Sequence, residues 1–467
     1  MTDQIPVKNI TPKASSVDLY AKREAIYTRA FTGLFRNIRI AAGLFLFATF
    51  LGTVWLQWGD RQAVWWNLPE RKFYIFGATF WPQDFMLLSW LLIICAFGLF
   101  FITVFAGRVW CGYTCPQSVW TWLFMWCEKV TEGDRNARMK LDKAPMSANK
   151  FLRKSAKHIL WISIGFATGF TFVGYFTPIR ELGMDLITGN ADGWAYFWVG
   201  FFTLLTYLNA GWLREQVCIH MCPYSRFQSV MFDKDTLIVS YDPKRGEKRG
   251  PRKKGSDYKA QGLGDCIDCK LCVHVCPTGI DIRDGLQIAC IGCAACIDAC
   301  DDVMLKVGYP KGLISYTTEH NLSGQKTKLI RPRLIGYAAA LLIMSSLFGY
   351  TIFNRTLVEL NVLKDRTPYR ENQEGRIENV YTLKIMNKDQ KDHVYVIEAT
   401  GLNGLTLEGK RHISAAAGEI LSVPVSISVD PEDIPSSTNK IEFSIVSEDD
   451  NSIHRTAESR FLSPSIR

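Results

Sequence analysis

The chain has 467 residues, of which 48% are apolar, and it contains 14 tryptophans and 28 phenylalanines. This is more aromatic and apolar mass than a small soluble domain needs, and it indicates a membrane protein. The formal net charge is +9. We expect no nucleic-acid partner, because no aromatic-rich binding surface accompanies the basic residues and anionic lipid headgroups account for them.

Residues 1–35 are too charged to contain the apolar core of a cleavable signal peptide, and we expect a cytoplasmic tail there. Five later segments run without a charged residue for about the length of a bilayer-spanning helix, roughly 20 residues. They are 40–59, 85–107, 159–179, 193–213 and 334–354. Aromatic residues such as Trp55 and Trp194 lie near their ends, as is typical of transmembrane helices. We therefore predict a four-helix membrane unit over 36–235 and a fifth transmembrane helix over 333–354.

Basic residues set the expected orientation in the membrane. The loop 128–157 contains nine Lys and Arg residues, whereas the two loops expected on the other side of the membrane together contain four. The positive-inside rule then places the N-terminus, this loop and 214–333 in the cytoplasm, and 355–467 outside. The uncharged segment 109–127 would send the nine basic residues outside if it crossed the membrane. We expect it to be re-entrant or interfacial.

Two short motifs pair cysteines at the ends of the second and fourth predicted spans. Each has two cysteines four residues apart, one helical turn, followed directly by proline. They are Cys111-Gly-Tyr-Thr-Cys115-Pro116 and Cys218-Ile-His220-Met221-Cys222-Pro223. The hairpins that they close look like an internal duplication, so we expect the two pairs to face one another in one catalytic site. Four soft thiolates would bind Cu(I), with His220 and Met221 as further candidate ligands. A third iron–sulfur cluster, or simple packing of small buried residues, would also explain the pairs.

The segment 236–332 follows with a basic linker and then eight cysteines within 35 residues. They form two runs of equal spacing, Cys266, Cys269, Cys272 and Cys276, then Cys290, Cys293, Cys296 and Cys300. This is the spacing of bacterial two-cluster ferredoxins, in which the fourth cysteine of each run binds the other run's cluster. We therefore assign two [4Fe–4S] clusters, one to Cys266, Cys269, Cys272 and Cys300, the second to Cys290, Cys293, Cys296 and Cys276. Structural zinc rarely uses two such regular runs, and disulfides would leave the triplets unexplained.

Beyond the last predicted span, the segment 355–467 has the pattern of a β-structure. Short stretches rich in Val and Ile are separated by Gly, Pro, Asn and Asp, and apolar and polar residues alternate along 422–429. The predicted strands are 380–386, 393–399, 420–429 and 441–446. Alternation with turn residues between the strands favours an Ig-like β-sandwich, for which a binding or docking role is the modest inference.

The order of these parts resembles the FixG/RdxA/CcoG family of accessory proteins of cbb3-type cytochrome c oxidase. The resemblance extends from about residue 25 to about residue 460 and includes Arg108-Val-Trp-Cys-Gly-Tyr-Thr-Cys-Pro116 and Val380-Tyr-Thr-Leu-Lys-Ile-Met-Asn387. The membrane half is also similar to the ferredoxin-type membrane subunits of periplasmic nitrate reductase systems, which share the paired-cysteine motifs. The resemblance implies a multi-pass protein of the bacterial inner membrane, with a cytoplasmic ferredoxin-type domain and a periplasmic C-terminal domain.

The same resemblance implies a function. A member of this family would act as a cupric reductase, with copper as its substrate or transient ligand, and would reduce Cu(II) to Cu(I) during delivery to the oxidase. Oxidase assembly factors or copper chaperones would then be its partners, and a cytoplasmic donor that the sequence does not identify would supply the electrons. Two other functions stay open: a quinol-linked membrane electron carrier, and a non-redox assembly scaffold with structural clusters.

Overall fold

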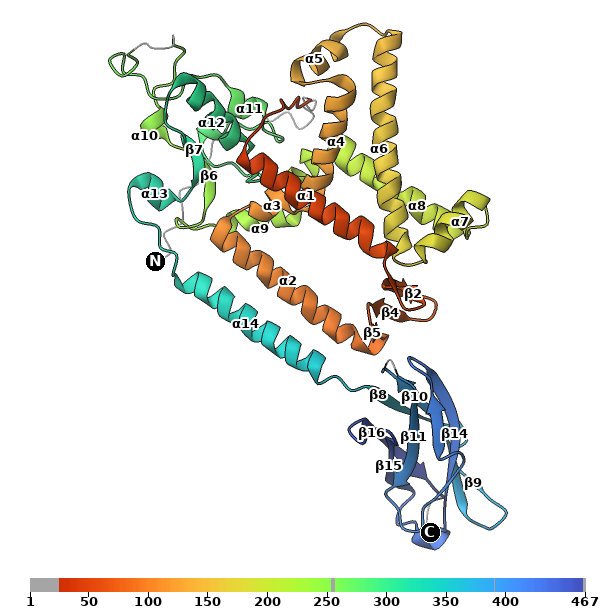
Figure 1. Cartoon of the computed structure of the whole chain (residues 1–467). Coiled ribbons are helices and arrows are strands. Elements are labelled where there is room, and N and C mark those ends of the chain that lie inside the picture. The colour runs from red at the N-terminus through yellow and green to blue at the C-terminus, as the bar shows by residue number, and fades with distance from the viewer. Residues whose placement is uncertain (1–24, 253–256, 390, 465–467) are drawn as a thin grey trace, which may run out of the picture. The chain divides into compact units, whose positions relative to one another are not determined.

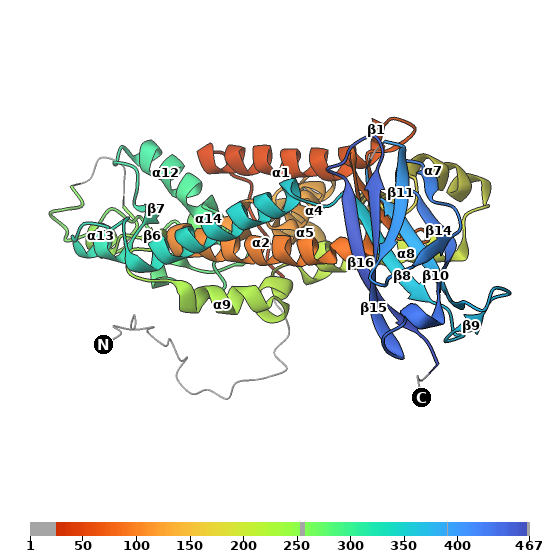
Figure 2. The same ribbon diagram turned by 90° about the horizontal axis from the view of Figure 1, so that it is seen from below.

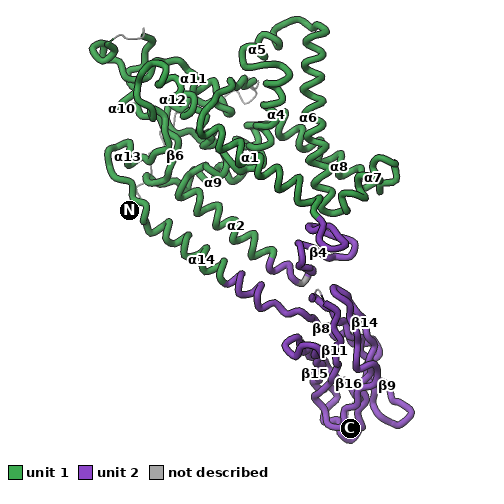
Figure 3. Tube along the Cα trace, viewed as in Figure 1, with its two compact units in different colours: residues 1–56, 88–346 green, residues 57–87, 347–467 purple. Residues whose placement is uncertain are grey.

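The computed structural model describes residues 25–252, 257–389 and 391–464. Residues 1–24 of the predicted tail 1–35 therefore lie outside the described residues. The chain forms two compact units, shown in two colours in Figure 3. The first comprises Met1–Leu56 and Leu88–Ser346, and the second comprises Gln57–Leu87 and Leu347–Arg467. The first unit thus contains both the membrane helices and the cysteine-rich segment, which we predicted as separate domains.

Four helices among the described residues are long and apolar enough to cross a membrane. They are α1 (Leu34–Gly52), α2 (Phe85–Ala106), α6 (Ala148–Gly174) and α14 (Pro332–Phe353). Within the first unit α2 lies beside α14, and the rings of Phe97 and Tyr337 are 6.3 Å apart (Figures 1 and 2). These helices match four of the five predicted spans.

The remaining predicted span, 193–213, is divided between two kinds of helix. The α-helix α8 (Gly193–Thr206) continues as the π-helix η3 (Tyr207–Leu213), so neither part alone has the length of a span. The α8 helix packs closely on α6, because a Cβ on Gly169 would lie 2.7 Å from the Val199 carbonyl oxygen. Small residues of this kind let two helices approach within a membrane. The count of five spans stays a prediction.

The segment 109–127 is two helices with a break between them. The short helix α3 (Val109–Tyr113) ends at Tyr113, and α4 (Pro116–Glu132) begins at Pro116. Proline lacks an N–H group and has a helical φ, so it terminates one helix and starts the next. The α4 helix then packs on α6, where the Phe124 and Trp161 rings stack 5.3 Å apart. The connecting helices of this region are α5 (Arg135–Lys143), α7 (Ile179–Thr188), η4 (Val217–Met221) and α9 (Pro223–Met231).

The cysteine-rich segment is closed by two strands from its opposite ends. The strand β6 (Ile238–Tyr241) pairs antiparallel with β7 (Ile314–Thr317). Between them lie α10 (Pro243–Gly246), α11 (Leu271–His274), η5 (Ile282–Asp284) and α12 (Ala295–Val307), and α13 (Glu319–Ser323) follows β7. Its core packs Val239, Ile282 and Met304 against the buried Cys266 and Cys272. The cysteines are therefore part of an apolar interior.

The second unit contains the predicted β-sandwich. One antiparallel sheet has the order β12-β14-β10-β8, with β9 paired to β10, and the other has the order β13-β11-β15-β16. The strands are β8 (Val358–Lys364), β9 (Arg370–Glu371), β10 (Ile377–Asn387), β11 (His393–Thr400), β12 (Thr406–Glu408), β13 (His412–Ala415), β14 (Ile420–Val429), β15 (Thr438–Ser447) and β16 (His454–Leu462). Inward-facing residues such as Tyr381, Tyr395 and Phe443 fill the core. The four predicted strands fall within β10, β11, β14 and β15, and the sandwich prediction is confirmed.

The loop that precedes α2 forms small strands that the sequence did not reveal. They are β1 (Gln57–Trp58), β2 (Arg61–Gln62), β3 (Val64–Asn67), β4 (Lys72–Ile75) and β5 (Ala78–Phe80). This loop belongs to the second unit because Asp84 forms ion pairs with Arg355, at 2.6 Å, and with Lys388, at 3.4 Å.

Candidate functional site

The eight cysteines of the double run surround two cavities. Cys266, Cys269, Cys272 and Cys300 line one cavity, together with apolar residues such as Met304 and Ile314. Cys276, Cys290, Cys293 and Cys296 line the other, which Cys272 also borders. Each cavity therefore combines three cysteines of one run with the last cysteine of the other run. This is the grouping on which the crossed ligand assignment depends.

The two runs have the same backbone conformation at corresponding positions. In the first run Asp268 and Lys270, on either side of Cys269, have positive φ angles of 54° and 53°. In the second run Gly292 and Ala294, on either side of Cys293, have φ angles of 65° and 58°. Left-handed residues in alternation curl a chain into a concave turn with its N–H groups on the inside. The strain that non-glycine residues accept here is typical of a ligand-binding loop.

The chemistry of the two cavities fits iron–sulfur clusters. Burial raises the pKa values of the Cys272, Cys290 and Cys300 thiols to about 12, so cluster assembly must displace protons from them. Among the described residues, no three His, Cys, Asp or Glu side chains converge as the ligands of one metal ion would. The four thiols of each set surround a space instead. Cysteine thiolates around such a cavity are what a cluster requires.

The two paired-cysteine motifs end in the same way, although Cys111 lies in an α-helix and Cys218 in a π-helix. Cys115 directly precedes α4, whose first residue is Pro116. Cys222 directly precedes α9, whose first residue is Pro223. Burial raises the pKa of the Cys218 thiol to about 12, and the nearby Cys115, Cys111 and Cys222 raise it further. All four thiols therefore lie within electrostatic range of one another.

Hydrogen bonds connect the first motif to the segments on either side of the second motif. The Gln117 amide donates to the Asn209 carbonyl oxygen at 2.9 Å and to the Arg214 carbonyl oxygen at 3.2 Å. The Cys111 thiol donates to the Gln228 side-chain oxygen at 3.5 Å. The structure thus places the four cysteines singled out from the sequence within electrostatic range of one another, but among the described residues no three of them converge as the ligands of one metal ion would. His220 and Met221 are different: both are exposed, Met221 to 62%, whereas Cys218 and Cys222 are partly buried.

The first motif also touches the second cysteine run through its backbone. A Cβ on Gly112 would lie 2.9 Å from both the Gly292 carbonyl oxygen and Cys293 Cα. Only glycine permits this approach. The Tyr316 hydroxyl donates to the same Gly292 oxygen at 2.6 Å and lies 3.2 Å from the Tyr113 hydroxyl. Cys111 therefore lies next to the set of Cys276, Cys290, Cys293 and Cys296.

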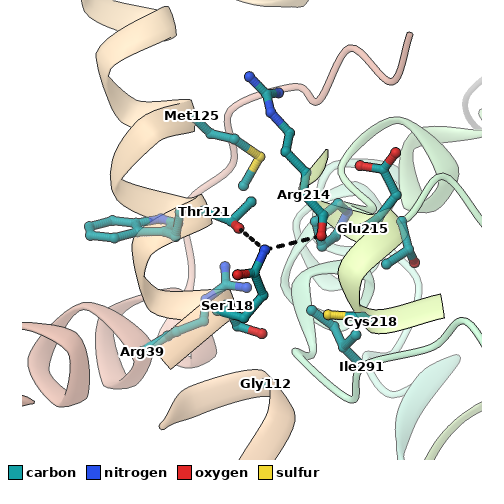
Figure 4. A pocket seen from close by; sticks show the side chains of 13 residues that line it. Arg39, Gly112, Ser118, Thr121, Met125, Arg214, Glu215, Cys218 and Ile291 are labelled. Atoms are coloured by element: carbon teal, nitrogen blue, oxygen red, sulfur yellow. Dashed lines mark hydrogen bonds between the residues drawn. The ribbon is translucent and has the colours of Figure 1, made fainter. Parts of the chain in front are cut away.

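A small cavity opens between the second motif, α4 and the second cysteine run (Figure 4). Its lining includes Cys218, Glu215, Thr121, Met125 and Ile291. In the close-up, Cys218 lies beside Ile291 of the second cysteine run, and Thr121 and Met125 project from the facing helix. The cations Arg39 and Arg214 also line this space.

The sequence analysis missed three residues of this site. Arg108 received no role of its own from the sequence, yet it is the single charged residue between 85 and 127, and an isolated charge in such a stretch signals a function. Gly112 carries no signal beyond its place between two cysteines. Gln228 is fully buried on α9, and its side-chain nitrogen has no hydrogen-bond partner among the described residues.

In a comparison with known proteins, two separate parts of the chain match two protein families. Residues 213–319 match the family described as a 4Fe-4S dicluster domain, and residues 348–464 match the Ig-like fold at the C-terminus of FixG, a putative oxidoreductase. The nitrogen fixation protein FixG of Rhizobium meliloti is 38% identical over 89% of this chain and 86% of its own length. Protein RdxB of Cereibacter sphaeroides is 39% identical over 89% of this chain and 91% of its own length. The ferredoxin-type protein NapH of Haemophilus influenzae is 24% identical over 44% of this chain and 64% of its own length.

Proposed function

The chain belongs to the FixG/RdxA family of membrane iron–sulfur electron-transfer proteins, and on this basis we propose that it reduces Cu(II) to Cu(I) for assembly of a cbb3-type oxidase. The reaction adds one electron to Cu(II) and breaks no covalent bond. A cytoplasmic donor supplies the electron, and copper is the substrate.

The iron–sulfur ligands in this proposal are the two sets of cysteines that line the two cavities. Cys266, Cys269, Cys272 and Cys300 hold one [4Fe–4S] cluster, and Cys276, Cys290, Cys293 and Cys296 hold the second. When bound, such clusters supply electrons one at a time, which matches a one-electron metal reduction. The chain contributes the soft ligands, the apolar walls and the fixed loop conformation.

The copper site in this proposal is formed by Cys111, Cys115, Cys218 and Cys222. Thiolates bind Cu(I) in preference to harder ions, so a site of four thiols favours the reduced product. The observation that carries the proposal is the backbone contact of Gly112 with Gly292 and Cys293. It brings the paired thiols next to the second set of iron–sulfur ligands. We further propose that the C-terminal sandwich faces the periplasm and docks an assembly factor or copper chaperone.

Replacement of Cys111 and Cys115 by serine tests this function. The change removes two soft ligands with little change in volume, so the protein should keep its full iron content. Copper binding and the rate at which Cu(II) reoxidises the dithionite-reduced protein should both fall. Cys95→Ser is the matched control, because Cys95 is a single exposed cysteine on α2. A double variant with full iron and undiminished Cu(II) reduction would refute the copper site.

A second candidate function, electron uptake from a quinol, is favoured by a larger cavity beside the same site. Its volume is about 560 Å³, within the range of small-molecule sites. It is lined by Trp161, Tyr207 and His158, and the Tyr207 hydroxyl lies 2.9 Å from His158 Nδ1. This pair could exchange protons with a hydroquinone. Rapid reduction of the oxidised protein by a soluble quinol, abolished by Tyr207→Phe, would support this function, and inertness to quinol would exclude it.

A further inference from the structure

Arg108 is a buried cation at the junction of three chain segments. Arg108 follows the end of α2 in the chain, and only 7% of its surface is exposed. One guanidinium nitrogen donates to the carbonyl oxygens of Ile288 and of Cys290, the latter at 2.7 Å, and the other donates to the Ser225 carbonyl oxygen at 2.8 Å. Cys290 begins the second cysteine run, and Ser225 follows the second paired-cysteine motif. The guanidinium therefore joins both paired motifs to the second run.

This cation has no acidic partner among the described residues. Its three hydrogen-bond acceptors are neutral carbonyl oxygens. The groups that can become negative and that interact with it electrostatically are the Cys111, Cys290 and Cys218 thiols and the Tyr224 hydroxyl. Burial of a charge without a counter-ion is costly, and proteins rarely accept that cost for stability alone. Arg108 therefore faces the negative charge of the cysteine thiolates and of the group that these thiolates hold.

We propose that Arg108 is a positioning residue that also raises the reduction potential at the second cysteine run, so that an electron is held next to the paired thiols. The inference rests on the proposed function for its ligands and deepens it. One-electron reduction adds one negative charge inside the site held by Cys276, Cys290, Cys293 and Cys296. A fixed cation bonded to the Cys290 carbonyl stabilises that added charge, because net charge and hydrogen bonding set the potentials of such sites. Among the described residues, the hydrogen bonds of Arg108 reach the second run and not the first, so the first should feel this effect less.

The test separates charge from shape with two variants of the full-length protein. Arg108→Lys keeps the charge but loses the planar fork, and Arg108→Met keeps the apolar stem but loses the charge. The midpoint potentials of the two clusters are measured by redox titration followed by electron paramagnetic resonance, with iron content determined alongside. Lys306→Met is the control, since Lys306 is a 73% exposed cation on α12 whose charge water and salt screen.

We expect Arg108→Met to lower the midpoint potential of one cluster and to leave the other unchanged. Arg108→Lys should retain most of the original potential, and Lys306→Met should change neither. Equal potentials in Arg108→Met and the parent protein, an equal shift of both clusters, or an equal shift in the Lys and Met variants would each overturn the proposal. If Arg108→Met does not retain iron, Arg108→Gln replaces it with the same expectation. Loss of iron from Arg108→Lys as well would reduce Arg108 to a structural role.

This readout does not depend on copper. If the Cys111 and Cys115 double variant reduced Cu(II) at the full rate, the proposed function would fail. A selective shift of potential in Arg108→Met would still establish the electrostatic role. The failure of one proposal is thus distinguishable from the failure of the other.

Discussion

The Asp298 carboxylate accepts a hydrogen bond from the backbone N–H of Arg36 at 2.8 Å, so a residue of the second cysteine run caps the first membrane helix. Its other oxygen accepts from the Phe35 N–H at 3.2 Å. Asp298 lies on α12 midway between Cys296 and Cys300, and α1 begins at Leu34. A negative charge at a helix N-terminus satisfies free N–H groups and interacts favourably with the helix dipole. The cap therefore fixes the cluster-binding helix to the membrane unit.

The first prediction concerns this cap. Asp298→Ala should lower the free energy of unfolding by about 1–2 kcal/mol, the usual cost of losing an N-cap, and Asp298→Asn should cost less because it keeps an acceptor. Thermal unfolding of the detergent-solubilised chain measures the effect. Asp302→Asn is the control, because Asp302 pairs with Lys306 on the exposed face of the same helix. If the Ala variant and this control had equal stability, the cap would contribute nothing.

The second prediction concerns pH and Lys364 at the end of β8. Burial lowers the pKa of Lys364 to about 8, and its ammonium nitrogen has no hydrogen-bond partner among the described residues. The folded state then binds this proton less tightly than the unfolded state, whose lysine has a pKa of about 10.4. The stability contribution of Lys364 is thus lowest below pH 8 and rises as the pH rises from about 8 to about 10.

Replacement by methionine removes this effect. Lys364→Met should raise the melting temperature at pH 7, and its advantage over the parent protein should shrink towards pH 10. The difference between the two proteins is what matters, because other groups titrate equally in both. A difference that is constant with pH would show that Lys364 has an ordinary pKa in the folded protein.

The third prediction tests the crossed ligand sets. The purified chain should contain about eight iron atoms, as two four-iron clusters require. Cys300→Ser should damage the cluster of the Cys266, Cys269 and Cys272 triplet, and Cys276→Ser should damage the other. Iron content and the electron paramagnetic resonance signal of the surviving cluster distinguish the two variants. If each serine variant lost the cluster of its own run, the ligands would not cross.

Side-chain patterns in the sequence predicted the parts of this protein well. The spacing of the cysteines anticipated the two sets that line the two cavities, and the predicted strand 420–429 has the same bounds as β14. Charge-free stretches anticipated α1, α2, α6 and α14. Each of these features depends on residues close together in the chain, where side-chain type and local geometry are directly linked.

The contacts that hold these parts together could not be predicted from side-chain patterns. Arg108 bonds to carbonyl oxygens, and Gly112 contacts backbone atoms of Gly292 and Cys293, so the partners can have any side chain. The change from α-helix to π-helix at Tyr207, within the predicted span 193–213, also had no recognisable pattern in the sequence. There a π-helix leaves the Asn209 carbonyl oxygen to accept from the Arg214 N–H at 2.8 Å and from Gln117. The loop strands β1 to β5 have two to four residues each, too few to show alternation.

The fourth prediction concerns topology. A reporter that is active only outside the cytoplasm should be active when fused after residue 467 and inactive when fused after Lys157, because nine basic residues hold the loop 128–157 inside. A fusion within the loop 180–192, which has one basic residue, should be active and serves as the internal control. Reporter activity after Lys157 would mean that α4 crosses the membrane and that the charge rule fails for this chain.

The fifth prediction is that Gly112 controls electron transfer to the paired thiols. In Gly112→Ala the new methyl group would lie 2.9 Å from the Gly292 carbonyl oxygen and Cys293 Cα, so the motif and the second cysteine run must move apart. Such overpacking costs about 1–3 kcal/mol of stability, which leaves the protein folded. Both the eight iron–sulfur ligands and the four paired thiols remain, so iron content and copper binding should be unchanged. The rate at which Cu(II) reoxidises the reduced protein in a stopped-flow experiment should fall, since the two sites are further apart.

Gly200→Ala on α8 is the matched control, because a Cβ there meets no atom within 4 Å. If Gly112→Ala reduced Cu(II) as fast as Gly200→Ala, electrons would not pass at this contact, and the paired cysteines would have to be reached by another route.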